Sequence, residues 1–90
     1  MDNAVCELEE LSSVKDYVNR KLCEYERLEV GIFPITHSII RRKAKPCAVY
    51  FCLHGPRSVK FTAIWEQASN TVFLYGANGE RFETLVLHGR

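Results

Sequence analysis

A short basic run is the part of this sequence best suited to binding a charged ligand. It comprises Arg41, Arg42, Lys43 and Lys45 and is followed by Pro46. A dense group of cations attracts phosphate, either on a nucleic acid or on an anionic lipid headgroup. Without an accompanying motif the same run is typical of a solvated surface loop. The chain carries no RNP-type aromatic motif, GxxG loop or zinc-finger spacing, so nucleic-acid binding is the alternative hypothesis here.

Four further residues would strengthen a nucleic-acid site. Arg57 and Lys60 would add charge if a hairpin places them beside the basic run. Tyr50 and Phe61 would supply rings on which bases stack. The net charge of +1 is too small to favour nucleic acid by itself. Arg57 also follows a Gly-Pro turn, where it could anchor an acidic protein partner.

Cysteine and histidine side chains are the next candidates for chemistry. Cys47, Cys52 and His54 are of the types that bind zinc, but Cys47 and Cys52 are five positions apart and point to opposite faces of a strand. Cys52 and His54 share a strand face, as a thiol nucleophile and its base must. A thiol within an apolar strand is usually inert. We therefore expect no metal, no cofactor and no small-molecule substrate, and we rank a thiol enzyme last.

The sequence also limits where the chain is expected to act. Residues 1–7 are acidic and lack the apolar core of a secretory signal, and no apolar run is long enough to span a membrane. The 4 cysteines are then expected to be thiols rather than disulfides. These features predict a cytoplasmic or nuclear protein that is not secreted.

One amphipathic helix is predicted over residues 14–28. Ser13 with Asp16 three residues later fits an N-terminal cap. At helical spacing the apolar side chains fall on one side. They are Val14, Tyr17, Val18, Leu22, Tyr25 and Leu28. Residues 1–11 are expected to form either a short helix or a frayed lead-in.

Residues 46–88 show the pattern of a β-meander. The predicted strands are Cys47–Leu53, Ser58–Glu66, Thr71–Tyr75 and Arg81–His88, separated by segments rich in turn residues. The second of them alternates best, with Val59, Phe61, Ala63 and Trp65 on the predicted core face. Asn78-Gly79 is the strongest hairpin signal in the chain.

The segment between the helix and the meander is harder to assign. Residues 29–33 are predicted to form a strand, since they are mostly β-branched and apolar and Gly31 interrupts the helical pattern. Residues 35–42 suit a helix or a strand. Pro34 at a first helical position tips the prediction slightly towards a short helix.

Together these elements predict one two-layer α+β domain over residues 1–90, with the helix packed on an antiparallel sheet of four to five strands. One helix covers one face, so Ile64, Leu74 and Leu85 are predicted to form an exposed patch on the other, unless residues 1–11 or 35–42 cover that face. We therefore expect a small non-catalytic adaptor or regulatory module that binds another protein, or a second copy of itself, through a sheet face or edge and the basic loop. The expected partner-binding residues are Arg41, Arg42, Lys43, Lys45, Arg57, Lys60, Ile64 and Leu74.

Overall fold

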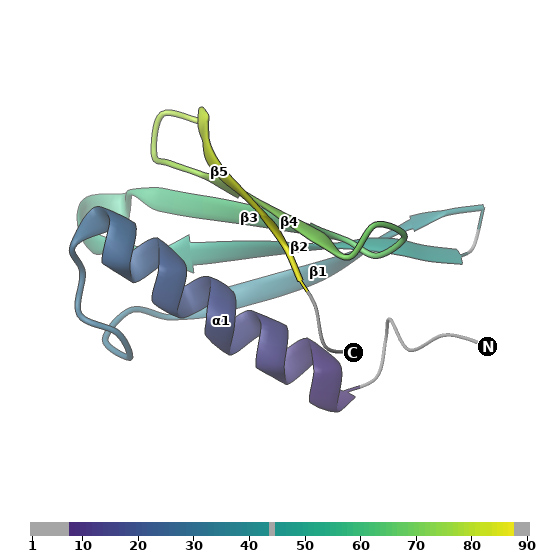
Figure 1. Ribbon diagram of the computed structural model, residues 1–90. Helices are drawn as coiled ribbons and strands as arrows, with labels where there is room; N and C mark the ends of the chain where they lie inside the picture. Colours follow the sequence, from purple (N-terminus) through teal and green to yellow (C-terminus); the bar gives the residue numbers. More distant parts are fainter. Residues whose placement is uncertain (1–7, 44, 88–90) are drawn as a thin grey trace.

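A single layer of five antiparallel strands lies behind one helix in the computed structural model (Figure 1). The structure describes the backbone of residues 8–43 and 45–87 and the side chains of residues 11–43 and 48–87. The elements are α1 (Leu8–Glu26), β1 (Ile35–Arg42), β2 (Lys45–His54), a short 3-10 turn (Pro56–Ser58), β3 (Lys60–Glu66), β4 (Thr71–Tyr75) and β5 (Arg81–Val86). This confirms the predicted two-layer α+β arrangement.

Each strand of the sheet pairs with the strand that follows it, in the order β1-β2-β3-β4-β5. The predicted Asn78-Gly79 turn joins β4 to β5, where Gly79 adopts φ +84° and Asn78 Oδ1 accepts a hydrogen bond from the Glu80 N–H at 3.0 Å. Only a residue that tolerates positive φ fits such a turn without strain. In the part of the chain that the structure describes, α1 lacks the apolar run that a membrane-spanning helix needs.

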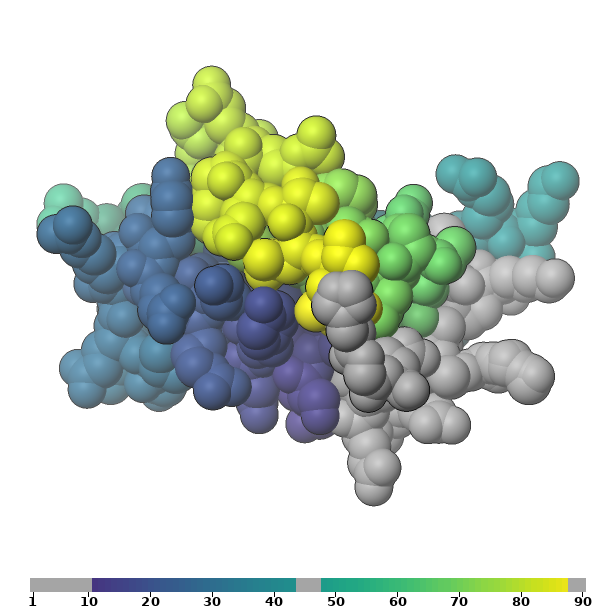
Figure 2. Space-filling view, in the orientation of Figure 1, coloured from purple at the N-terminus to yellow at the C-terminus, as the bar shows by residue number. Residues whose placement is uncertain are grey.

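The core lies between α1 and the sheet face turned towards it. Alternate residues of β2, β3 and β4 meet a stripe of α1 residues spaced three or four apart. The buried set is Leu11, Val14, Val18, Leu22, Cys23, Val49, Phe51, Leu53, Phe61, Ala63, Trp65, Val72 and Leu74. The predicted core face of β3 is thereby confirmed. In Figure 2, α1 and β5 lie side by side on the face of the molecule that is turned towards the viewer.

The helix begins and ends differently from the prediction. It starts at Leu8, so Ser13 is exposed within it and is not an N-cap. The apolar stripe explains the extension, because Leu11 continues it by another turn and is buried. At the other end Arg27 adopts φ 59°, and the Leu28 N–H donates to the Cys23 carbonyl at 2.8 Å. This is a Schellman ending with arginine at the position usually held by glycine.

Two predictions for residues 29–42 are wrong. Residues 30–33 are turn and bend rather than strand, and residue 29 has no regular structure; Gly31 has φ +93°, outside the range of a β-strand. Residues 35–42 form β1 rather than a short helix, paired with β2 from Ile35 opposite Leu53. The ladder hydrogen bonds to β2 outweigh the weak helical preference of a β-branched segment.

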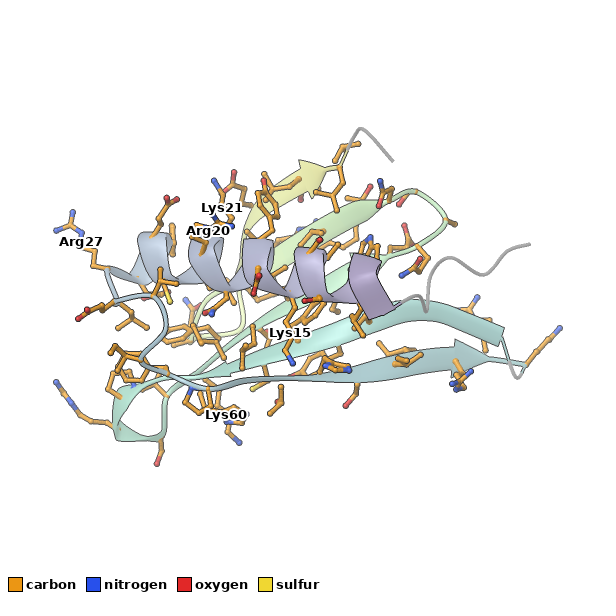
Figure 3. All side chains as sticks on the ribbon, turned by 90° about the horizontal axis from the view of Figure 1, so that it is seen from below. Lys15, Arg20, Lys21, Arg27 and Lys60 are labelled. Carbon is orange, nitrogen blue, oxygen red and sulfur yellow. The ribbon has the colours of Figure 1, made fainter. Side chains whose placement is uncertain are left out.

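Two contacts fix α1 against the edges of the sheet. Lys15 Nζ lies 3.2 Å from Nδ1 of His37 on β1, and Figure 3 shows Lys15 pointing from the helix towards that strand. At the opposite edge the rings of Tyr25 and Phe82 stack with centroids 3.6 Å apart and planes 8° apart. The helix therefore contacts both edge strands as well as the centre.

Candidate functional site

The sheet face opposite α1, named here the open face, is the candidate site. No element among residues 8–43 and 45–87 packs over it. Its side chains come from the strand positions that alternate with the core positions. Figure 3 shows Lys60 of β3 on the side of the sheet away from the helix.

Cross-strand pairing arranges the open face in three rows. The central row is Ser38, Tyr50, Ile64, Phe73 and Thr84. The next row, towards the β2–β3 turn, is Thr36, Cys52, Thr62, Tyr75 and Arg81. The row on its other side is Ile40, Ala48, Glu66, Thr71 and Val86. Beyond the second row, His54 pairs with Lys60.

The rows bring large apolar groups to the surface. Ile40, Tyr50 and Val86 expose 40%, 37% and 56% of their surface, values typical of polar residues. Ile64 and Phe73 lie half-buried between them in the same layer. These apolar side chains on one uncovered face make it the candidate binding surface.

Charged groups sit at the margins of the open face. Lys60 and Glu66 are both exposed and occupy the two ends of β3. Glu66 accepts a hydrogen bond from the Ser69 hydroxyl at 2.5 Å, which holds its carboxylate in place. The Arg81 guanidinium lies 5.1 Å from the centroid of the Phe73 ring, a cation–π contact that covers part of that ring.

Leu74 and Leu85 are not part of this face, so two of the three residues predicted for the exposed patch are wrong. Leu74 is fully buried and pairs with Ala63 on the core side, and Leu85 packs against the core from β5. Phe73 and Tyr75 take the outward positions of β4 instead. Ile64 does lie on the open face, at the centre of its middle row.

The basic run lies at the end of the β1–β2 hairpin. Arg41, Arg42 and Lys43 are exposed there, and Figure 2 shows this end projecting beyond the rest of the surface. The backbone of Lys45 pairs with Arg42, and the side chain of Lys45 lies outside the described residues. The three described cations therefore form one projecting cluster.

Arg57 and Lys60 do not join this cluster, which corrects the prediction that they could. Both lie at the other end of β2, a strand of 10 residues. Ten residues of strand span roughly 30 Å. Phe61 is also wrong as a stacking surface, because it is buried in the core. Tyr50 is exposed, but it stands in the middle of the open face.

The thiols and imidazoles do not assemble into a reactive group. Cys52 is nearly buried in the open face, and Nε2 of His54 lies 3.1 Å from the Thr36 hydroxyl. Cys23 is buried in the core, and this burial raises the pKa of its thiol. Among the described residues no group of three histidine, cysteine, aspartate or glutamate side chains could hold a metal. The side chain of Cys47 lies outside the described residues.

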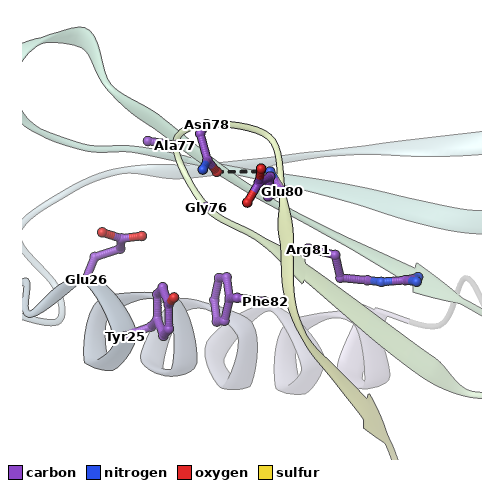
Figure 4. A pocket seen from close by; sticks show the side chains of 8 residues that line it. All are labelled: Tyr25, Glu26, Gly76, Ala77, Asn78, Glu80, Arg81 and Phe82. Atoms are coloured by element: carbon purple, nitrogen blue, oxygen red, sulfur yellow. Dashed lines mark hydrogen bonds between the residues drawn. The ribbon is translucent and has the colours of Figure 1, made fainter.

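A hollow of about 430 Å³ lies between the end of α1 and the β4–β5 turn (Figure 4). The stacked Tyr25 and Phe82 line one part of it, and residues 76–78 line another. Glu26, Glu80 and Arg81 are its charged groups. Among the described residues that line it, the phenol of Tyr25 is the only hydroxyl group, and none carries a thiol or an imidazole. This lining offers no nucleophile paired with a base.

Sequence reasoning missed Phe73 and Tyr75 as members of the open face. Glu66 was predicted on the outer side of β3, because it alternates with Trp65 on the core side, but it was not among the expected partner-binding residues. The sequence of β4 does not show which of its residues lie on the open face, because all but Thr71 in Thr71–Tyr75 are apolar or aromatic.

Comparison of the chain with protein-family models, with curated proteins and with solved structures finds no match.

Proposed function

We propose that this chain is a small non-catalytic interaction module that binds another protein through the open face of its sheet. The observation that carries the proposal is the apolar central row, Tyr50–Ile64–Phe73, together with exposed Ile40 and Val86. Covering apolar surface contributes roughly 25 cal/mol per Å². A partner that covers this face would therefore gain stability from it.

The shape of the open face suits a protein rather than a small molecule. Small-molecule sites are concave and enclose most of their ligand, whereas this surface is the broad face of an open sheet. Thr36, Thr62 and Thr84 are spread among the apolar residues and offer hydroxyls to a partner's polar groups. Such a mixture of apolar centre and polar surroundings is typical of protein interfaces.

The proposed place of action is the cytoplasm or the nucleus. Cys23 and Cys52 are both free thiols. Reducing compartments keep thiols in this state. Because the proposed module binds a protein without catalysing a reaction, we propose a regulatory or adaptor role for it.

Nucleic-acid binding is the second candidate function. It is supported by the exposure of Arg41, Arg42 and Lys43 together on one projecting hairpin. It is weakened by the burial of Phe61 and by the distance from the hairpin to Arg57 and Lys60. Phosphate contacts from three cations would give weak, salt-sensitive affinity without base stacking.

Site-specific photocross-linking in cells tests the protein-binding proposal. A benzophenone amino acid replaces Tyr50 on the open face and, as a matched control, Ile32, which is 59% exposed in the loop after α1. We expect position 50 to give a cross-linked protein of defined mass that position 32 does not give. Identical products from both positions, or no product from position 50, would contradict the proposal.

A further inference from the structure

We propose that the partner of the open face is the open face of a second copy of this chain, with the two β3 strands antiparallel across a two-fold axis. This inference rests on the proposed function and names its partner. It comes from the order of side chains that β3 presents on the open face, which is Lys60, Thr62, Ile64 and Glu66.

The charges of β3 are complementary to themselves. Lys60 and Glu66 are equally far from the midpoint between Thr62 and Ile64. A two-fold axis through that midpoint, in the plane of the interface and across the strands, places Lys60 of each copy opposite Glu66 of the other. Symmetry forms this ion pair twice. Stacked sheets lie roughly 10 Å apart, a gap that a lysine and a glutamate side chain bridge together.

The same axis also pairs the neighbouring strands favourably. On β4 it sets Phe73 opposite Tyr75 of the second copy, and on β2 it sets Tyr50 opposite Cys52. Facing sheets commonly cross at an angle within about 30°, which keeps these groups within contact range. Aromatic pairs add stabilisation beyond the area they bury. The aromatic and apolar groups of the two rows beside the axis are thereby covered in both copies.

The charges also disfavour the other symmetric arrangement. An axis parallel to β3 would set Lys60 over Lys60 and Glu66 over Glu66. Like charges facing each other across an interface disfavour it and thereby select against the wrong geometry. In the antiparallel arrangement, each end of β3 faces the oppositely charged end of β3 in the second copy.

The size of the face sets the expected strength. Six residue steps along β3 and four strand spacings across the sheet give roughly 400 Å² per copy. Stable interfaces cover about 800 Å² per partner, so this dimer belongs to the weak, concentration-dependent class. We expect dissociation constants in the range of tens to hundreds of micromolar, on the order of 10⁻⁵ to 10⁻⁴ M.

Sedimentation of the full chain from about 10 µM to about 1 mM covers this range. The wild type is expected to shift from monomer to dimer. Lys60→Glu and Glu66→Lys each replace two attractions with two repulsions, so each variant alone should dimerise at least about tenfold more weakly. An equimolar mixture of the two variants, and the double variant K60E/E66K, should regain wild-type dimerisation because opposite charges face each other again.

Three results would overturn the inference: a wild type that stays monomeric, single variants that dimerise as the wild type does, or a mixture that fails to regain the dimer. Two-dimensional NMR spectra establish that each variant is folded, which is expected because both side chains are exposed. Failure here is distinct from failure of the proposed function. If the wild type is monomeric and position 50 cross-links to a different protein, the dimer inference is wrong but the protein-binding proposal stands. If position 50 gives no cross-link at all, both are contradicted.

Discussion

The indole nitrogen of Trp65 donates a hydrogen bond to Oδ1 of Asn70 at 2.9 Å. Trp65 is fully buried, so this amide oxygen is what satisfies its N–H away from water. The Asn70 amide donates in turn to the Leu87 carbonyl at 3.0 Å, and the Leu87 N–H donates to the Asn70 carbonyl at 2.9 Å. One residue in the β3–β4 turn thus fastens the core tryptophan to the end of β5.

Replacing Asn70 with alanine should therefore be strongly destabilising. We expect Asn70→Ala to lower the free energy of unfolding by about 2–4 kcal/mol, because it leaves the buried Trp65 N–H unpaired and puts alanine at a positive φ. Asn70 has φ 52°. Asn70→Gly is the matched control, since glycine accepts this φ and loses only the side-chain bonds. Urea unfolding measures both; a loss below about 0.5 kcal/mol for N70A would refute this role.

Cys23 gives a prediction for the dependence of stability on pH. Burial raises the pKa of the Cys23 thiol above its usual value of 9.0. Above pH 9.0 the unfolded chain therefore loses this proton while the folded chain keeps it, which favours unfolding. The contribution of Cys23 to stability is complete below that pH and declines as the pH rises through it.

The measurement compares the wild type with Cys23→Ala by urea unfolding at a series of pH values from neutral to alkaline. Lysine and tyrosine titration affects both proteins alike, so their difference isolates the thiol. We expect the stability advantage of the wild type over C23A to shrink above pH 9.0. A difference that stays constant with pH would show that the folded thiol titrates as it does in the unfolded chain.

Ile64 tests whether the centre of the open face carries the association. Ile64→Thr keeps a β-branched residue in β3 but removes apolar surface, and a symmetric dimer carries the change twice. We expect it to weaken dimerisation about tenfold, with little change in stability. Ile32→Thr makes the same change in the exposed loop after α1 and should leave the dimer unaffected. Equal effects of both variants in sedimentation would count against the open face.

The basic hairpin tests the second candidate function. In an NMR titration with a mixed-sequence single-stranded oligonucleotide, that function predicts shifts at Arg41–Lys43 that weaken steeply with salt and disappear in R41E/R42E. The control R20E/R27E makes the same change of charge on α1 and at the residue just after it; both arginines are exposed and labelled in Figure 3. Equal affinity of all three proteins would dismiss phosphate binding by the hairpin. Dimerisation should survive in R41E/R42E, because the hairpin lies beyond the open face.

The sequence predicted the elements whose two faces differ in polarity. The apolar stripe of α1 and the core side of β3 were both correct, because polar residues mark their outer positions. β4 was misjudged because Leu74 and Phe73 are both large and apolar, so alternation carries no information there. β1 was ambiguous for a related reason: Ile35 and Ile39, four positions apart, share a side in a helix and in a strand alike.

The candidate site was predicted only in part. Ile64 was found because it interrupts the polar side of β3, which also carries Thr62. Its cross-strand neighbours Tyr50 and Phe73 depend on a register that only strand pairing sets. The grouping of Arg57 with the basic run conflicts with the predicted strand Cys47–Leu53, which already separates the two. Two turns at opposite ends of one strand cannot approach each other, and β2 runs unbroken between them.

The neighbour-to-neighbour order of the strands has a consequence for how the chain folds. Because each strand pairs with the next, every ladder closes only a short loop, and the sheet can grow hairpin by hairpin at modest entropic cost. α1 differs, since its buried Val18 and Leu22 wait for strands that come later in the chain. During synthesis this apolar stripe therefore stays incompletely covered until β2, β3 and β4 have all been made. In that interval the nascent chain is most open to chaperones and to aggregation.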